Sequence, residues 1–196
     1  MRTIADHVLD IASNSVTAGA TQIWLDLNHD PVDHLFVFTV RDNGRGMDAD
    51  IRTRVFDPFF TTRQHSIRRF GLGLPFLKEN TELTGGGVDL RSVAGEGTIL
   101  TAVFHTDHID CLPLGDLASS IFTLLISGGA VDWHIHRAEG DLAYTVDSEE
   151  LRSVFSSEEL TDPQAQLLLL EFLRGQEGDI VQDSGHEFGQ ESRPRS

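Results

Sequence analysis

Two segments of alternating character, Ile23-Trp-Leu-Asp-Leu27 and Phe36-Val-Phe-Thr-Val40, occur near the start of the chain, and the second runs directly into a third, Arg41-Asp-Asn-Gly-Arg-Gly-Met47. Apolar side chains recur at every second position of the first two segments, which is the pattern of a strand with one buried face. The segment between them, His29-Asp-Pro-Val-Asp33, is rich in turn-forming residues. The third segment contains too much glycine to continue a strand. These residues therefore predict two paired strands, the second of which ends in a glycine-rich turn at Asp42.

A helix is predicted before this pair, from Thr3 to about Ala18. Thr3 and Asp6 have the spacing of a capping box, although Asp is the weaker partner at the second position. At 100° per residue, apolar side chains occupy one broad face of this helix. A narrow polar stripe borders that face and is placed to look into a cleft; it consists of His7, Asp10 and Asn14.

The sequence after the strand pair completes an α+β pattern. This pattern includes one long ordered loop, and ordered loops of such length are often lids over a binding site. The full element order predicts a two-layer sandwich in which helices cover one face of a mixed β-sheet. The expected elements are a short helix over Asp48–Val55, the long loop over Phe56–Phe70, a helix from Gly71 to about Leu83, and a hairpin of strands Val88–Val93 and Thr98–Phe104.

The rest of the chain predicts a small α/β C-terminal extension. Helices are expected over Asp116–Ser127 and Gln164–Arg174, with a hairpin over Val131–Val146 between them. Beyond Gly175 the sequence is polar and rich in Gly, Glu and Ser, which is typical of a disordered segment. The predicted organisation is a first domain of residues 1–108, an extension of residues 109–175 with no assigned role, and a disordered tail of residues 176–196.

Composition argues against several classes of function. The chain of 196 residues has 15 basic and 31 acidic residues, which give a net charge of -16. Such a charge repels nucleic acid and anionic lipid, so neither is expected as a main partner. No apolar run approaches the roughly 20 residues that cross a bilayer, and the N-terminal segment does not have the pattern of a signal peptide. A single cysteine, Cys111, fits a reducing compartment. A cytoplasmic protein is therefore expected.

Five short motifs occur in order between residues 7 and 98: His7-Val-Leu-Asp-Ile-Ala-Ser-Asn-Ser-Val-Thr-Ala-Gly-Ala20, Asp42-Asn-Gly-Arg-Gly-Met47, Phe56-Asp-Pro-Phe-Phe-Thr-Thr-Arg63, Gly71-Leu-Gly-Leu-Pro-Phe-Leu-Lys78 and Gly95-Glu-Gly-Thr98. They resemble, respectively, the asparagine box, the first glycine box, the phenylalanine box, the second glycine box and the last glycine box of the GHKL superfamily. That superfamily includes histidine kinases, DNA gyrase, mismatch-repair ATPases and the large heat-shock chaperone. The resemblance covers about residues 4–105 and is closest to the catalytic ATP-binding domain of sensor histidine kinases. It implies a Bergerat-type fold that binds ATP with Mg²⁺.

The resemblance assigns roles to individual residues, and their chemistry suits those roles. It places Asn14 at the metal and the phosphates, and Mg²⁺ prefers oxygen ligands such as a side-chain amide. It places Asp42 at the adenine amine, which a carboxylate can accept. Gly44 and Gly46 let the backbone approach the ring closely, and Thr98 reaches the base directly or through water. Further nucleotide-site positions implied by the boxes are Met47, Phe60, Thr61, Leu72 and Leu74.

The phosphates are expected at the start of the helix that follows the lid. Gly71 and Gly73 precede or begin this helix, so backbone N–H groups and the positive end of the helix dipole can face an anion. Arginines in or beside the lid could cover phosphate oxygens. Among Arg63, Arg68 and Arg69, we favour Arg69 because it lies closest to Gly71 in the sequence.

Asp10 is the candidate catalytic residue. It precedes Asn14 by one helical turn, so both side chains lie on the same side of the helix. In hydrolytic members of the superfamily and in anti-sigma serine kinases, a Glu at this spacing acts as general base, whereas sensor histidine kinases more often have Asn. A carboxylate here could deprotonate a water or a hydroxyl group. Asp is one methylene shorter than Glu, so a metal-shell role and a structural role remain as alternatives.

Two departures from sensor kinases leave the function open between three hypotheses. Sensor kinases carry a phosphoaccepting domain before the ATP domain, but only six residues precede His7, so self-phosphorylation by that arrangement is not expected. Thr17 stands where kinases often have Lys, and the Asn-Ser…Ala-Gly-Ala ending resembles mismatch-repair ATPases. The leading hypothesis is a kinase-like module that phosphorylates or regulates a separate protein. The alternatives are an ATP-hydrolysing switch and a nucleotide-binding pseudo-kinase. The oligomeric state stays open, with a homodimer as one alternative.

Overall fold

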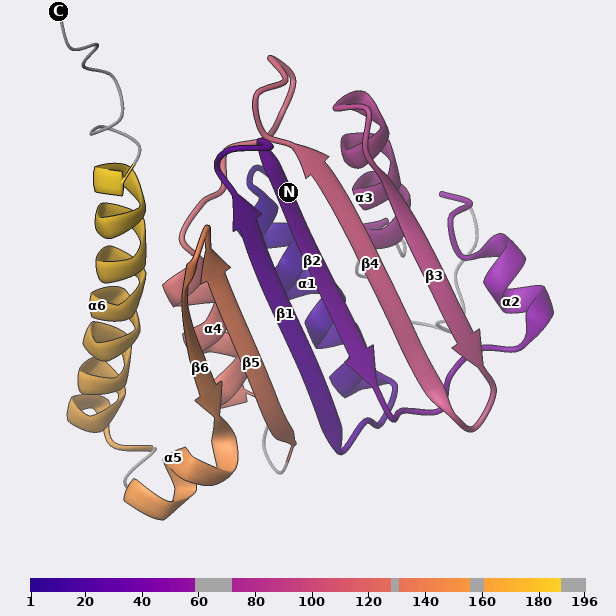
Figure 1. The fold of residues 1–196 in the computed structure, drawn as a ribbon. Helices are drawn as coiled ribbons and strands as arrows, with labels where there is room; N and C mark the ends of the chain where they lie inside the picture. The colour runs from indigo at the N-terminus through magenta and orange to yellow at the C-terminus, as the bar shows by residue number, and fades with distance from the viewer. Residues whose placement is uncertain (59–71, 128–130, 156–160, 188–196) are drawn as a thin grey trace, which may run out of the picture.

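The chain folds into one six-stranded mixed sheet with helices packed on one of its faces (Figure 1). The computed structural model describes residues 1–58, 72–127, 131–155 and 161–187. The strand order across the sheet is β3-β4-β2-β1-β5-β6. Its elements are α1 (Ile4–Thr17), β1 (Gln22–Asp30), β2 (Leu35–Asp42), α2 (Ala49–Arg54), α3 (Gly73–Leu83), β3 (Gly87–Val93), β4 (Gly97–His105), α4 (Leu117–Ser127), β5 (Asp132–Glu139), β6 (Leu142–Asp147), α5 (Ser148–Val154) and α6 (Pro163–Glu187). The predicted α+β class, with helices on one face, is confirmed.

The sheet's inner side chains line up in rows because each strand holds a fixed register with its neighbours. One row runs across all six strands and is entirely apolar, and it forms the centre of the core beneath α1, α3 and α4. The residues of this row are Leu90, Leu100, Val40, Leu25, Ile135 and Val146. One row nearer the end of the sheet, the same geometry aligns Ser92, Thr98 and Asp42. The core therefore gives way to polar side chains at one end of the sheet.

Helix α1 begins as the sequence predicts. The Thr3 hydroxyl accepts from the Asp6 amide at 3.1 Å, and the Asp6 carboxylate accepts from the Thr3 amide at 3.2 Å, which completes the capping box. The prediction that all three side chains of the polar stripe look into a cleft is wrong for one of them, however. His7 does not face a cleft, because it is 0% exposed and its Nε2 lies 3.0 Å from the side-chain nitrogen of Asn80 on α3.

The C-terminal extension continues the sheet. Strand β5 pairs in parallel with β1 along its whole length, from Gln22 opposite Asp132 to His29 opposite Glu139, and β6 pairs with β5 as a hairpin. Parallel neighbours need a long crossover connection, which the β2–α4 stretch of the chain supplies. None of the helices in the described ranges is long and apolar enough to cross a membrane.

Helix α6 is longer than the sequence predicts. The expected helix ends at Arg174 and a disordered tail follows, but α6 continues to Glu187. Tertiary contacts explain the difference. Glu177 accepts hydrogen bonds from the Arg137 Nε at 3.2 Å and from the Tyr144 hydroxyl at 2.7 Å, and Ile180 packs into the core. These contacts outweigh the polar, glycine-containing local sequence.

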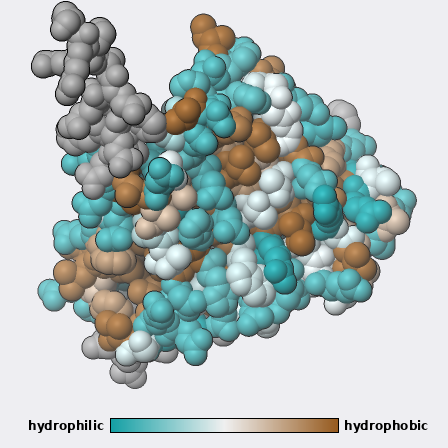
Figure 2. All heavy atoms as spheres, in the orientation of Figure 1, coloured by the Kyte–Doolittle hydropathy of each residue, from teal (hydrophilic) through white to brown (hydrophobic). Residues whose placement is uncertain are grey.

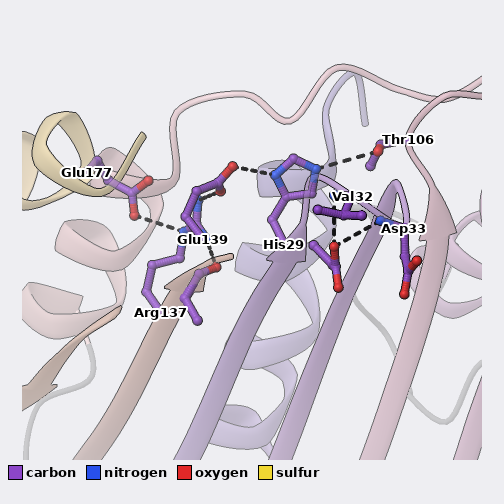
Figure 3. A network of polar contacts seen from close by, with 9 residues as sticks. His29, Val32, Asp33, Thr106, Arg137, Glu139 and Glu177 are labelled. Carbon is purple, nitrogen blue, oxygen red and sulfur yellow. Dashed lines mark hydrogen bonds and ion pairs between the residues drawn. The ribbon is translucent and has the colours of Figure 1, made fainter. Parts of the chain in front are cut away.

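The contacts of Glu177 belong to a buried polar network at the end of the core opposite Asp42 (Figure 3). Arg137, which is fully buried, also donates to Glu139 at 2.7 Å, and Glu139 lies 2.7 Å from the Nδ1 of His29. Burial opposes the ionisation of Glu139, but the hydrogen bonds from His29 and Arg137 outweigh it and lower its pKa. Burial and the nearby Glu177 carboxylate raise the pKa of Tyr144. The network ties β1, β5, β6 and α6 together.

The other face of the sheet is not covered by helices (Figure 1). Figure 2 shows hydrophilic and hydrophobic side chains intermingled on this face. Trp24 lies between the Arg41 guanidinium, 4.6 Å from its ring centre, and the His134 ring, which is stacked on it at 5.4 Å. His134 in turn contacts Asp147 at 2.5 Å. These contacts partly shield Trp24 from solvent.

The burial of His7 predicts a loss of stability in mild acid. Burial, with a smaller contribution from the N-terminal amine and against the opposing effect of Asp6, lowers the pKa of His7 from 6.5 to about 4. Between these values the unfolded chain binds the proton and the folded chain does not, so stability falls as pH falls from about 6.5 to 4, by on the order of 3 kcal/mol. His7→Leu should remove this contribution, as measured by urea unfolding across that pH range. His108→Gln, an exposed control, should keep the wild-type slope.

Candidate functional site

The polar end of the sheet brings the predicted base-recognition residues together. Asp42 ends β2 and pairs directly with Thr98 at the start of β4, and Thr98 pairs with Ser92 near the end of β3. All three side chains lie in one row on the face of the sheet that carries α1. Asp42 and Thr98, which lie far apart along the chain, are therefore neighbours in the sheet.

Asp42 is held in one orientation by two hydrogen bonds. It is 7% exposed; its Oδ2 accepts from the Ser15 hydroxyl at 2.6 Å and its Oδ1 accepts from the Gly44 amide at 2.8 Å. Each carboxylate oxygen has two lone pairs, so acceptor capacity remains for a ligand. Ser15 follows Asn14 in α1, so the same contact brings the predicted metal-binding helix against the predicted base-binding strand. Ser15 is not among the predicted site residues, and its only signal in the sequence is its position beside Asn14.

Ser92 organises the far wall of the site and was also missed. Its hydroxyl accepts from the Met47 amide at 2.8 Å, donates to the Gly97 carbonyl at 3.0 Å, and lies 2.9 Å from the Thr98 hydroxyl. A serine has one hydroxyl proton. Because Gly97 takes it, Thr98 must donate to Ser92, and the Thr98 oxygen keeps only acceptor capacity toward a ligand. The alternation of residues 88–93 places Ser92 on the inner face, and this was the signal available in the sequence.

The glycine-rich turn is clamped between α1 and the β3–β4 hairpin. The Arg45 amide donates to the Ala18 carbonyl at 3.1 Å, and the Gly95 amide donates to the Arg45 carbonyl at 2.8 Å. Gly46 has φ +60°, and a Cβ built on it would lie 2.0 Å from the carbonyl oxygen of Val93. Only glycine fits there, because both the backbone conformation and the space exclude a side chain. The turn is therefore a rigid wall beside Asp42.

The start of α3 lies against Asp10. A Cβ built on Gly73 would lie 1.9 Å from the Oδ2 of Asp10, so the helix backbone touches the carboxylate directly. Leu72 caps this helix without a side-chain hydrogen bond, which leaves amide groups of the first turn without a side-chain cap. Asp10 and Asn14 are both half-buried and lie one turn apart on α1. This end of the site thus combines two oxygen-bearing side chains with a helix N-terminus.

Several predicted site residues lie outside the described part of the chain. They are Phe60, Thr61, Arg69 and Gly71, together with Arg63 and Arg68. Leu72 and Leu74 are described and half-buried at the start of α3. Within the described ranges, no three His, Cys, Asp or Glu side chains are arranged to hold a metal ion. The oxygen atoms of Asn14 and Asp10 are nevertheless hard donors of the type that Mg²⁺ accepts beside phosphate and water.

A cavity of about 510 Å³ lies on the outer side of α3, away from Asp42. Most of its described lining residues are apolar, and none of them belongs to the glycine-rich turn. We place the candidate site at Asp42 because buried, oriented polar groups converge there. The cavity is lined by Phe56, Pro58, Pro75, Phe76, Lys78, Glu79, Glu82 and Leu83.

Comparison with known proteins defines the family. Residues 2–108 match the family of histidine kinase-, DNA gyrase B-, and HSP90-like ATPases. This match spans more than half of the chain, and the chain belongs to that family, whose members bind ATP with Mg²⁺. The GHKL resemblance noted in the sequence is confirmed.

Individual relatives are sensor kinases. The chain is 30% identical over 98 residues to the sensor histidine kinase AtsR of Burkholderia thailandensis, covering 48% of this chain and 16% of that protein. It is 39% identical over 74 residues to the sensor protein kinase PilS of Pseudomonas aeruginosa, covering 38% of this chain and 13% of that protein. The matched segment is thus a small part of each relative.

A solved structure extends the fold comparison beyond the family match. The N-terminal domain of a DNA repair protein superposes with a TM-score of 0.51 at 12% identity, covering 75% of this chain and 52% of that one. Because 75% of the chain exceeds the share occupied by residues 2–108, the shared fold includes part of the C-terminal extension.

The tight fit of Gly46 predicts a large effect of a single methyl group. Gly46→Ala should displace the turn from Val93 and lower the melting temperature by more than 5 °C, because a clash with backbone cannot be relieved by side-chain rotation, at roughly 2 kcal/mol or more. Gly95→Ala is the matched control: Gly95 also has positive φ, but its added Cβ would meet no atom within 4 Å. It should cost only the conformational strain of about 1 kcal/mol. Equal losses in differential scanning fluorimetry would contradict the clash.

Proposed function

We propose that this chain is an ATP- and Mg²⁺-binding, histidine-kinase-like module that phosphorylates or regulates a separate partner protein. The observation that carries the proposal is the contact between Ser15 and the buried Asp42. It joins the buried carboxylate that we propose to bind the base to the helix that carries Asn14, next to the glycine-rich turn. Membership of the ATPase family supports the ligand, and the sensor kinases among the relatives support phosphoryl transfer.

At the base end, the chain's own groups would read adenine by hydrogen bonding. The Asp42 carboxylate is an acceptor for the exocyclic amine, and Thr98 is a second acceptor whose direction is set by Ser92. Guanine has a carbonyl where adenine has its amine, so it would set acceptor against acceptor. We therefore assign base selectivity to Asp42 and Thr98, with Met47 as part of the wall.

At the phosphate end, Asn14 and the first turn of α3 would hold the charged part of the nucleotide. Bound Mg²⁺ would supply charge neutralisation for the phosphates there. Asp10 lies against the start of α3, where it could orient and deprotonate a hydroxyl group or a water. The protein's net charge of -16 repels a nucleotide at long range, so this local arrangement has to provide the attraction.

ATP hydrolysis that drives a conformational switch is the second candidate. A carboxylate one helical turn before Asn14 favours it, since Asp10 could activate water as readily as a protein hydroxyl. A pseudo-kinase that binds ATP without turnover is the remaining alternative. The three functions share the same binding site and differ in what Asp10 does.

Binding is tested by thermal unfolding with Mg-ATP. A ligand at a hundredfold excess over its Kd stabilises the folded state by about 2.7 kcal/mol, which for a chain of this size raises the melting temperature by roughly 5 to 10 °C. Asp42→Asn should fold but show less than a fifth of this shift, because the amide replaces one acceptor oxygen by an NH2 donor and leaves the other as an uncharged, weaker acceptor. Asp26→Asn, on the open face of the sheet, should keep the full shift. A wild-type protein that shows no shift would exclude the proposal.

Turnover is tested by following the γ-phosphate. Radiolabelled phosphate on a co-purified protein, lost in Asp10→Asn, is expected for a kinase acting in trans. Sustained phosphate release by the protein alone would favour the ATPase. Binding without either product would favour the pseudo-kinase. Ser13→Ala, on the exposed side of α1, is the control and should leave turnover unchanged.

A further inference from the structure

Helices α1 and α3 are joined by a polar contact inside an apolar layer. The Nε2 of His7 lies 3.0 Å from the side-chain nitrogen of Asn80, and the His7 ring lies 6.3 Å from the ring of Phe104. His7 is 0% exposed, and Leu77, on the same side of α3, is fully buried too. An amide nitrogen only donates, so His7 accepts at Nε2.

If the contact between His7 and Asn80 served only to pack α1 against α3, it would be unfavourable in free energy. The Nδ1 of His7 is buried and has no hydrogen-bond partner among the described residues. A buried polar atom without a partner costs about 1–3 kcal/mol, whereas two apolar side chains of similar size would fill the same space without that cost. The polar pair adds a defined alignment of the two helices. A hydrogen bond fixes the position of α3 along α1, whereas apolar contacts tolerate sliding.

The same two helices meet again where the phosphates are proposed to bind. Gly73 touches Asp10 at the start of α3, and Asn80 touches His7 two turns further along. A slip of α3 by one residue would move its N-terminus by about 1.5 Å. Such a shift is larger than the tolerance of a hydrogen bond from the first turn to an anion. Fixing Asn80 along α1 would therefore also fix the amides of the first turn of α3.

We propose that His7 and Asn80 are positioning residues, which set the N-terminus of α3 relative to Asp10 and Asn14 for the triphosphate end of the nucleotide. This inference rests on the proposed function. It separates the two ends of the site, because the side-chain hydrogen bonds of Asp42, Ser92 and Thr98 run to α1, the glycine-rich turn and the sheet, and not to α3. Loss of the His7–Asn80 contact should weaken recognition of the phosphates and leave recognition of the base unchanged.

The test compares two ligands on one variant. Asn80→Ala should lower the affinity for Mg-ATP about tenfold, which corresponds to about 1.4 kcal/mol, while the affinity for adenosine stays within twofold. Isothermal titration calorimetry measures both. His7→Ala should have the same effect, and the double variant should lose no more than either single variant, because the two residues form one contact. Glu79→Ala, on the exposed side of α3, is the control and should bind both ligands as the wild type does.

The results that would contradict the positioning role of His7 and Asn80 are as clear as those expected. A parallel loss of adenosine and Mg-ATP affinity would show general damage and overturn the inference, as would unchanged Mg-ATP affinity or additive losses in the double variant. If Asn80→Ala does not fold, Asn80→Gln keeps the amide and displaces it by one methylene, and the same ligand comparison applies. A wild-type protein that binds neither ligand would overturn the proposed function itself, and this inference with it.

Discussion

The hydrogen bond from Ser15 to Asp42 is the contact on which the site depends. It joins the helix layer to the sheet at the end of the core where Asp42, Thr98 and Ser92 lie, and a hydroxyl bound to a buried carboxylate is among the stronger hydrogen bonds in proteins. Because Asn14 and Asp10 are on the same helix as Ser15, this bond fixes the proposed base-binding residue Asp42 relative to the residues proposed to hold the phosphates. The glycine turn and Ser92 then shape the walls around a carboxylate that is already oriented.

Much of this arrangement was predictable because its signals are local. The alternation in β1 and β2 fixes which side chains face the core, and Asp42 continues that alternation at the strand end. Thr3 and Asp6 form the predicted cap. Gly46 was expected to let the backbone approach the adenine ring, and this stays a prediction, because the neighbour that the structure places against Gly46 is the Val93 carbonyl. The strand alternation and the helix cap depend on neighbours within a few residues, so the sequence is sufficient to find them.

Features that depend on distant partners were missed. Ser92 acquires its role from the β3–β4 register and from Met47, which lies far away in the sequence. His7 looks like part of a polar stripe until α3 packs over it. Helix α6 continues past Arg174 because Glu177 accepts a hydrogen bond from Arg137 of β5, and the local sequence of α6 does not indicate that partner. In each case a tertiary contact overrides the local pattern.

The parallel pairing of β5 with β1 has a practical consequence. The family match ends at residue 108, yet β1 is an interior strand only because residues 132–139 lie along its edge. A fragment cut at the family boundary would bare the N–H and C=O groups of β1 from Gln22 to His29, which now pair with β5. Such an edge invites pairing with other copies of the fragment, so the structural unit of the sheet is larger than the segment that defines the family.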